Sequence, residues 1–395
     1  MNSKERVKAA LHFKKPDKVP VFDQAAGDAF PIIITPSKRW KPGWNEGEEG
    51  LFPHIRGSYN WDEPPWAQGN PLYEGNKWRS IPHEEIDEWG CIWNMKGNDT
   101  DMGHPGRASL VDWDDYDRYI SNYNPNANDL TRFSLAHSMQ NGSGEDPYNL
   151  LLFPTQGPSH VVSAMRGFSN YLVDHAKHPL ELGRALEFVA EYHVNLMKNA
   201  LKNGINVHGI WLVDDLGEQQ GPFFSPKTFK KHYESSYKYI IDEAHKLGLD
   251  VHLHCCGKID RLLPVLIEWG LDAIELDSPR MSGYVDLRPY RGKIMFWGCV
   301  NIQSIYTLGT PEEVEREVWH MVRNLGTKNG GFGAYLYPQP KDIRVKRANI
   351  RAFKKGLKKY GVYSEIPAYW WSHPVTDFWK DSEVPPLPSL DSNKN

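Results

Sequence analysis

The sequence predicts an α/β fold, a (β/α)8 TIM barrel, and three observations support this prediction. Short apolar runs alternate with amphipathic segments after residue 145, the helical segments have clear caps, and polar residues follow the strands. Repeated strand–helix alternation implies parallel strands, because the connection between parallel neighbours is usually a helix. Seven countable strands, with an eighth obscured in an aromatic region, fit an eightfold barrel. A doubly wound sheet is the alternative, but no glycine-rich fingerprint follows any strand.

The predicted strands are short, apolar and rich in β-branched or aromatic residues. They are Val19–Asp23, Leu150–Thr155, Gly209–Asp215, Asp250–Cys256, Asp272–Asp277, Lys293–Cys299 and Gly331–Tyr337.

Three helices are predicted with the most detail. Ser225-Pro226 opens a helix that runs to about Leu247, and Thr310-Pro311-Glu312-Glu313 is a capping box for a helix ending at Leu325. Apolar residues recur at helical spacing across Pro179–Lys202.

We expect a single barrel domain over residues 1–395, with an aromatic-rich insertion and an extended tail. The insertion, residues 40–130, is expected to be irregular and to follow the first strand, and residues 363–395 form the Pro- and Trp-containing tail. Most of these tryptophans are expected to pack the cap together, while one or two face a ligand. Eight of the fifteen tryptophans lie between residues 40 and 113: Trp40, Trp44, Trp61, Trp66, Trp78, Trp89, Trp93 and Trp113.

Composition excludes several classes of protein. A net charge of -4 does not indicate the basic surface that would bind nucleic acid or an anionic membrane. The chain has no run of 18 apolar residues, and its first residues lack the apolar core of a signal peptide. Four cysteines in 395 residues do not make a disulfide framework. We therefore expect a cytoplasmic protein that binds neither nucleic acid nor membrane.

The most informative pattern is His252-Leu253-His254-Cys255-Cys256, followed by Gly257, at the end of a predicted strand. Side chains two positions apart on a strand point to the same side, so His254 and Cys256 can face one metal ion. Imidazole and thiolate are ligands that suit zinc. The structural alternative is that the cysteine is a small buried hydrophobe and the histidine a satisfied core residue.

Polar side chains gather where the predicted strands end. In a barrel these ends form one face, and active sites lie there. Exposure of the strand ends to solvent would account for one or two polar residues there. It accounts less well for a histidine, two cysteines and several carboxylates together. The residues are Asp214, Asp215, His254, Cys256, Asp277, Cys299, Asn301 and Gln339.

Several segments resemble the uroporphyrinogen decarboxylase superfamily over about residues 1–30 and 145–360. The sequence His254-Cys255-Cys256-Gly257 looks like the His-x-Cys-Gly of its zinc-dependent, corrinoid-linked methyltransferase branch, which is O-demethylase-like. The other matching segments are Ser3–Val7, Pro16–Val21, Asp214–Gly217, Gly221-Pro222, Ser225-Pro226, Gly298–Asn301 and Gly330–Phe332.

Two departures distinguish the chain from other members of that superfamily. True decarboxylases have an arginine-rich stretch after the first strand that binds substrate carboxylates, whereas residues 23–28 here contain no arginine and two aspartates. The thiol-methylating enzymes take another cysteine ligand after the last strand, whereas residues 337–341 contain neither cysteine nor histidine. The resemblance therefore implies zinc held by His254 and Cys256, with Cys299 or Asp277 as a further ligand. Cys299 is alternatively a small buried residue.

The resemblance implies an enzyme that moves a methyl group from a small methylated donor to a corrinoid (cobalamin) protein, with zinc activating the donor heteroatom. The aromatic cap favours an aryl methyl ether as the donor. Asp214 or Asp215 would position the donor or shuttle its proton, unless these residues are helix caps or backbone anchors. The alternatives are a metal-free decarboxylase-like lyase, a corrinoid-to-thiol methyltransferase and a non-catalytic zinc-binding subunit. Residues that bind the corrinoid, and assembly as a homodimer, are left open.

Overall fold

The computed structural model describes residues 1–23, 27–37, 82–96, 103–122, 125–142, 146–372 and 374. Eight strands close into a barrel in the order β1-β11-β10-β9-β8-β7-β6-β2, and all neighbouring pairs are parallel. This confirms the predicted TIM barrel. The strands are β1 (Val21–Phe22), β2 (Ala29–Ile33), β6 (Tyr148–Leu152), β7 (Gly209–Val213), β8 (Asp250–His254), β9 (Ala273–Leu276), β10 (Met295–Gly298) and β11 (Phe332–Tyr335).

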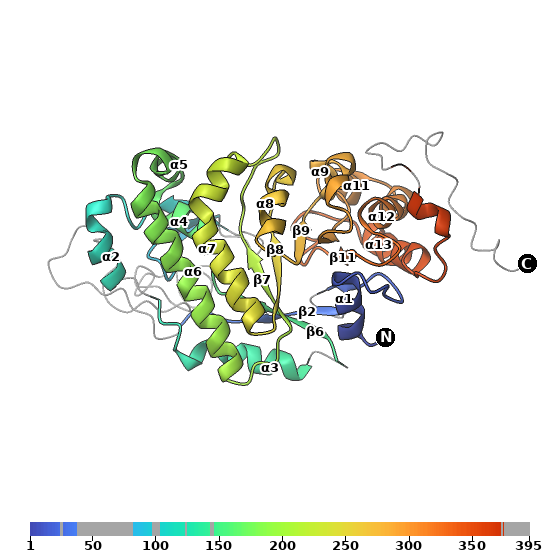
Figure 1. Cartoon of the computed structure of the whole chain (residues 1–395), viewed down its shortest axis with the longest axis horizontal. Helices are drawn as coiled ribbons and strands as arrows, with labels where there is room; N and C mark the ends of the chain where they lie inside the picture. The colour runs from blue at the N-terminus through green and yellow to red at the C-terminus, as the bar shows by residue number, and fades with distance from the viewer. Residues whose placement is uncertain are drawn as a thin grey trace, which may run out of the picture.

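Helices surround the barrel, and the long helices α6 and α7 run side by side along one flank (Figure 1). None of the helices in the described residues is both long and apolar enough to cross a membrane. The α-helices are α1 (Ser3–Leu11), α2 (Tyr116–Asn122), α3 (Ser134–Gly142), α4 (Pro158–Arg166), α5 (Phe168–Lys177), α6 (Pro179–Lys202), α7 (Pro226–Lys246), α8 (Leu263–Glu268), α9 (Pro279–Ser282), α10 (Tyr284–Leu287), α11 (Ile305–Leu308), α12 (Pro311–Leu325) and α13 (Arg347–Tyr360).

The predicted helix caps are present. The Ser225 side chain accepts a hydrogen bond from the backbone N–H of Thr228 at the start of α7. Thr310 and Glu313 form both bonds of the capping box at the start of α12. These side chains satisfy N–H groups that the first helical turn leaves without partners. Helix α6 has the predicted bounds, Pro179–Lys202.

The eighth strand is β2, and it lies before the aromatic segment rather than inside it. The expected insertion therefore follows the second barrel strand, which corrects the prediction that it follows the first. Two features hide β2 in the sequence. Pro31 cannot donate a ladder hydrogen bond and weakens the strand pattern, and no helix separates β1 from β2 in the element order.

The described part of the insertion contains regular structure, which corrects the expectation of an irregular segment. Strands β3 (His83–Ile86), β4 (Ile92–Met95) and β5 (His104–Arg107) form an antiparallel sheet. Helix α2 follows it within the insertion. Trp89 and Trp113 are buried, and Trp93 is partly buried. Trp40, Trp44, Trp61, Trp66 and Trp78 lie outside the described residues, as do 373 and 375–395 of the predicted tail.

Most barrel strands end a few residues earlier than the sequence pattern predicts. Strand β8 ends at His254 and strand β9 at Leu276, so Cys256 and Asp277 lie in the loops that follow them. Strand β7 ends at Val213, which places Asp214 and Asp215 in the next loop. The predicted polar residues thus lie at the carboxyl-terminal mouth of the barrel, where loops build the sites of this fold.

Candidate metal centre and adjoining pocket

His254 and Cys256 lie at the end of β8, and their side chains meet. The distance between His254 Nε2 and Cys256 Sγ is 3.4 Å. The intervening Cys255 is fully buried on the other side, where its Sγ accepts a hydrogen bond from the backbone N–H of Leu216 at 3.2 Å. The period-two alternation of an extended chain produces this separation.

The neighbouring strand β9 supplies a buried carboxylate, Glu275, that sequence reasoning missed. His254 and Glu275 are direct register partners in the β8–β9 pair. The His254 Nδ1 atom is hydrogen-bonded to a carboxylate oxygen of Glu275, which leaves Nε2 facing Cys256. A carboxylate on one ring nitrogen fixes the tautomer and directs the other nitrogen at a metal. The signal in the sequence was a glutamate inside the apolar run Ala273–Leu276.

Two aspartates complete the cluster. The Cys256 thiol donates to Asp277 Oδ2 across 3.2 Å, and the Cys256 backbone N–H donates to Asp215 Oδ1 across 2.8 Å. Two groups of three have ligand atoms that all lie within 4.8 Å of one another. One group is Asp215, His254 and Cys256, and the other is His254, Glu275 and Asp277.

Cys299 belongs to neither of these groups. Its side chain is almost fully buried after β10, and the backbone of Tyr337 is hydrogen-bonded to it. Burial, together with the nearby carboxylates of Glu275 and Asp277, raises the pKa of the Cys299 thiol well above its usual range. Its role as a ligand stays a prediction.

Asp214 is fully buried and anchors the start of α4. Its carboxylate accepts hydrogen bonds from the backbone N–H groups of Ser159, at 2.9 Å, and His160, at 2.8 Å. Tyr237 donates a third hydrogen bond to it. A Cβ atom at Gly157 would come within 2.4 Å of Asp214 Oδ2, so only glycine fits there. This geometry is that of the backbone anchor, one of the roles that the sequence left open.

The donor set fits a zinc ion. Burial raises the pKa of the Cys256 thiol to about 12, although the adjacent His254 lowers it in part, so a nearby cation is needed to hold the thiolate at neutral pH. Oε1 of Glu275 is buried without a hydrogen-bond partner. One imidazole, one thiolate and carboxylate oxygens are established zinc ligands. His254 Nε2, Cys256 Sγ and a carboxylate of Asp215 or Asp277 would hold it.

A cavity of about 270 Å³ opens directly beside this cluster, since Asp215 lines it. The other lining residues come from α4, α5, the loop after β7 and strand β5: Pro105, Ser159, His160, Ser163, Ala164, Phe168, Tyr171, Gly217 and Phe223. Two rings, Phe168 and Phe223, meet edge to face at a centroid distance of 5.2 Å. Trp93 of the insertion stacks on His160 at 5.9 Å.

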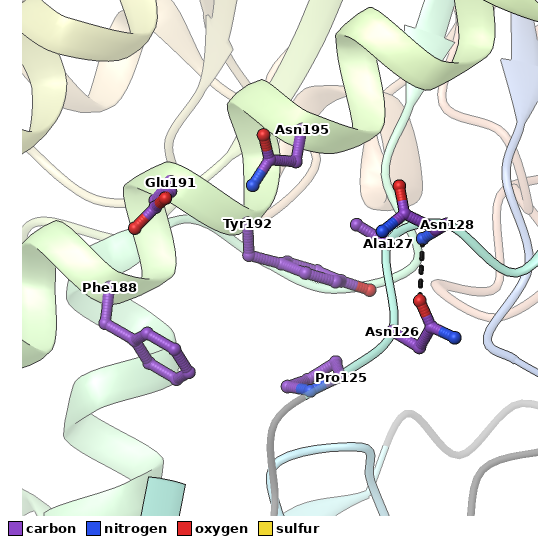
Figure 2. A pocket seen from close by; sticks show the side chains of 8 residues that line it. All are labelled: Pro125, Asn126, Ala127, Asn128, Phe188, Glu191, Tyr192 and Asn195. Carbon is purple, nitrogen blue, oxygen red and sulfur yellow. Dashed lines mark hydrogen bonds between the residues drawn. The ribbon is translucent and has the colours of Figure 1, made fainter.

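A larger cavity, about 420 Å³, lies between α6 and residues 125–128 (Figure 2). Phe188, Glu191, Tyr192 and Asn195 line it from α6, and the Tyr192 ring extends toward that loop, in which the backbone N–H of Asn128 donates to Asn126 Oδ1. Among the described residues, none that lines this cavity belongs to the metal cluster, and none is a cysteine or a histidine. The smaller cavity is therefore the better candidate for chemistry.

Comparisons with known proteins agree with the barrel. Residues 151–335 match the family model described as uroporphyrinogen decarboxylase (URO-D). No curated protein matches the chain. A solved structure described as a methyltransferase from Methanosarcina mazei is similar over 91% of this chain and 99% of that chain, with a TM-score of 0.58 and 15% sequence identity. At that identity the likeness shows the fold alone. The chain is thus a (β/α)8 barrel whose residues 151–335 are similar to the uroporphyrinogen decarboxylase family.

Proposed function

We propose that this protein is a zinc-dependent methyltransferase that passes a methyl group from an aryl methyl ether to a separate corrinoid protein. The observation that carries the proposal is the 270 Å³ cavity with Phe168 and Phe223 in its wall, which opens at Asp215 of the His254–Cys256 cluster. A flat aromatic donor suits this wall, because edge-to-face and offset ring contacts contribute about 0.5–1.5 kcal/mol beyond area burial. The match to the URO-D family and the similarity in fold to a methyltransferase support the coarser part of the proposal, a methyltransferase of this superfamily.

The chain's own groups have distinct tasks in this proposal. Zinc, when bound, supplies a Lewis acid for the ether oxygen of the donor. Glu275 holds the His254 ring so that Nε2 faces the cluster. Asp214 fixes the first turn of α4, which carries two lining residues of the cavity, Ser159 and His160. The walls of the cavity would hold the donor beside Asp215.

A metal-free decarboxylase is less well supported. The two aspartates after β1 are already paired, Asp23 with Lys354 and Asp28 with Arg6. Neither offers a positive charge to the carboxylates of a porphyrinogen, which need bidentate cationic partners. A thiol-methylating activity is also less well supported, because nothing in residues 337–341 supplies the further cysteine.

The test is to offer cob(I)alamin and zinc-loaded protein with methoxybenzenes, methanol, methylamines or methyl thioethers, and to follow methylcobalamin by its absorbance. We expect methyl transfer from the aryl ethers and none from the amines or thioethers. The Cys256→Ser variant should transfer no methyl group. Transfer from amines or thioethers alone would contradict the proposed donor, and no transfer from any of them would contradict the methyltransferase.

A further inference from the structure

A continuous chain of buried hydrogen bonds connects the cavity to α5 and α7. Ser159 Oγ lies 2.6 Å from the hydroxyl oxygen of Tyr171, and that hydroxyl is hydrogen-bonded to the hydroxyl of Tyr233. The Tyr233 hydroxyl oxygen lies 2.7 Å from His175 Nε2. The other ring nitrogen, His175 Nδ1, lies 2.8 Å from the backbone carbonyl oxygen of Tyr171.

The chemistry of the last bond fixes the direction of all the others. A carbonyl oxygen only accepts, so His175 Nδ1 carries the proton and Nε2 of the neutral ring accepts. Burial lowers the pKa of His175, which keeps the ring neutral at pH 7. Tyr233 must then donate to His175. Because each hydroxyl has a single hydrogen, Tyr171 must donate to Tyr233, and Ser159 must donate to Tyr171.

The consequence appears at the cavity end of the chain. Ser159 lines the cavity, but its only hydroxyl hydrogen is already committed to Tyr171. Toward a ligand, Ser159 Oγ therefore offers lone pairs and no hydrogen. Asp215, in the same wall, is a carboxylate and also accepts. A ligand hydroxyl could donate its hydrogen to Ser159 Oγ, whereas an ether oxygen at the same place would face only lone pairs, which weakens its binding.

We propose that Ser159 recognises a hydroxyl group of the methyl donor, so that the donor is an aryl methyl ether with a free hydroxyl group, of the 2-methoxyphenol type. This inference rests on the proposed function, since it names the donor class for the same cavity. The fully methylated analogue, 1,2-dimethoxybenzene, has nearly the same shape but only acceptor oxygens. The hydrogen-bond direction selects between the two.

The test compares the binding of the two ligands to zinc-loaded protein by isothermal titration calorimetry, with phenol and anisole as a second pair. We expect each hydroxylated ligand to bind at least about tenfold more tightly than its methylated partner. Ser159→Ala should reduce that ratio to about one. Tyr233→Phe should also reduce it, although Tyr233 is not among the lining residues of the cavity, because Tyr171 and Ser159 are then free to donate toward the ligand.

The matched control is Tyr237→Phe, which removes a hydroxyl from the same helix that donates to Asp214 and not to the chain. It should leave the ratio unchanged. Two results with the wild-type protein would overturn the inference: equal affinities for the two ligands of each pair, or no binding of any of these ligands. Neither result depends on a variant folding. Methyl transfer from both ethers without selective binding would overturn it while leaving the proposed function in place. Selective binding of 2-methoxyphenol without methyl transfer would contradict the proposed function and leave the hydrogen-bond selection in place.

Discussion

His254 and Glu275 face each other as register partners on adjacent parallel strands, and the His254 Nδ1 atom is hydrogen-bonded to a Glu275 carboxylate oxygen. Both side chains are largely buried. Burial raises the pKa of Glu275 to about 7, and the His254 ring offsets part of that shift. A metal ion on Nε2 would favour the arrangement in which Nδ1–H donates to an ionised Glu275, so the two residues would act as one unit in metal binding.

Glu275→Gln should therefore weaken zinc binding without removing a metal ligand of the Cys256 group. We expect a loss of about 10- to 100-fold in zinc affinity, typical of a lost partner behind a histidine ligand. Competition with a chromogenic chelator measures it. Unchanged affinity would mean that Glu275 serves only to fill the barrel interior.

Cys256→Ser should abolish stoichiometric zinc binding, while the barrel still folds. The control is Cys255→Ser, because the adjacent thiol faces away from the cluster and contacts the backbone of Leu216. A ligand that binds only the folded state raises its stability, by about 4 kcal/mol at a thousandfold excess over its Kd. Added zinc should thus raise the Tm of the wild type and of Cys255→Ser, but not of Cys256→Ser. A full zinc complement in Cys256→Ser, measured by elemental analysis, would contradict the assignment.

The barrel could be predicted from the sequence because its long helices have apolar faces of their own, and two of them, α7 and α12, also have side-chain caps. Helices α7 and α12 begin at the serine or threonine caps that the sequence marks. Strand β2 was hidden because Pro31 interrupts the pattern and the strand pairs with residues far along the chain, in β6. The pairing of β2 with β6 depends on tertiary contacts, and a local sequence pattern does not predict such contacts.

The site was predictable only in part, for similar reasons. Period two places His254 and Cys256 on one side, and strand ends place Asp215 and Asp277 nearby. The position of Glu275 opposite His254 depends on the register between β8 and β9, and one sequence does not give that register. The chain from Ser159 to His175 depends on how α4, α5 and α7 pack.

Substitutions of Asp214 and Asp215 should have different effects on the free energy of unfolding, although the two residues are adjacent. Asp214→Asn replaces a buried carboxylate that holds two backbone N–H groups and a tyrosine hydroxyl, so we expect a loss of about 2–5 kcal/mol in the free energy of unfolding. Asp215→Asn should leave stability within about 1 kcal/mol, because Asp215 accepts from Cys256 N–H through an oxygen that asparagine retains. Urea unfolding measures both. Equal destabilisation would contradict the anchor role of Asp214.

The further zinc ligand should be an oxygen rather than the thiol of Cys299. Asp277 Oδ2 lies 3.2 Å from Cys256 Sγ, whereas Cys299 is outside both candidate groups. Asp277→Asn should thus weaken zinc binding more than Cys299→Ser does. Chelator competition on the two variants ranks them, and the opposite order would favour the thiolate.

The hydrogen-bond chain from Ser159 should respond to pH through His175. Burial lowers the pKa of His175, and His232, whose ring lies 5.3 Å away edge to face, lowers it further, while the hydrogen bond to the Tyr171 backbone and, to a smaller extent, the charge of Asp174 oppose the shift. The pKa therefore lies below the ordinary 6.5. Above that value the ring is neutral, and protonation begins only as the pH falls.

Protonation of His175 should reverse the chain. Nε2 would then carry a hydrogen and donate to Tyr233, each hydroxyl would turn around, and Ser159 would offer its hydrogen to the cavity. The preference for 2-methoxyphenol over 1,2-dimethoxybenzene should thus be constant from pH 7 to 8 and decline below about 6.5. Calorimetric titrations from pH 5 to 8 measure the ratio of the two affinities, in which effects of pH on the metal cluster common to both ligands cancel. Tyr233→Phe provides the control, because a broken chain cannot transmit the change and its ratio should stay flat. A wild-type ratio that stays high down to pH 5 would show either that His175 remains neutral or that the cavity does not sense the ring.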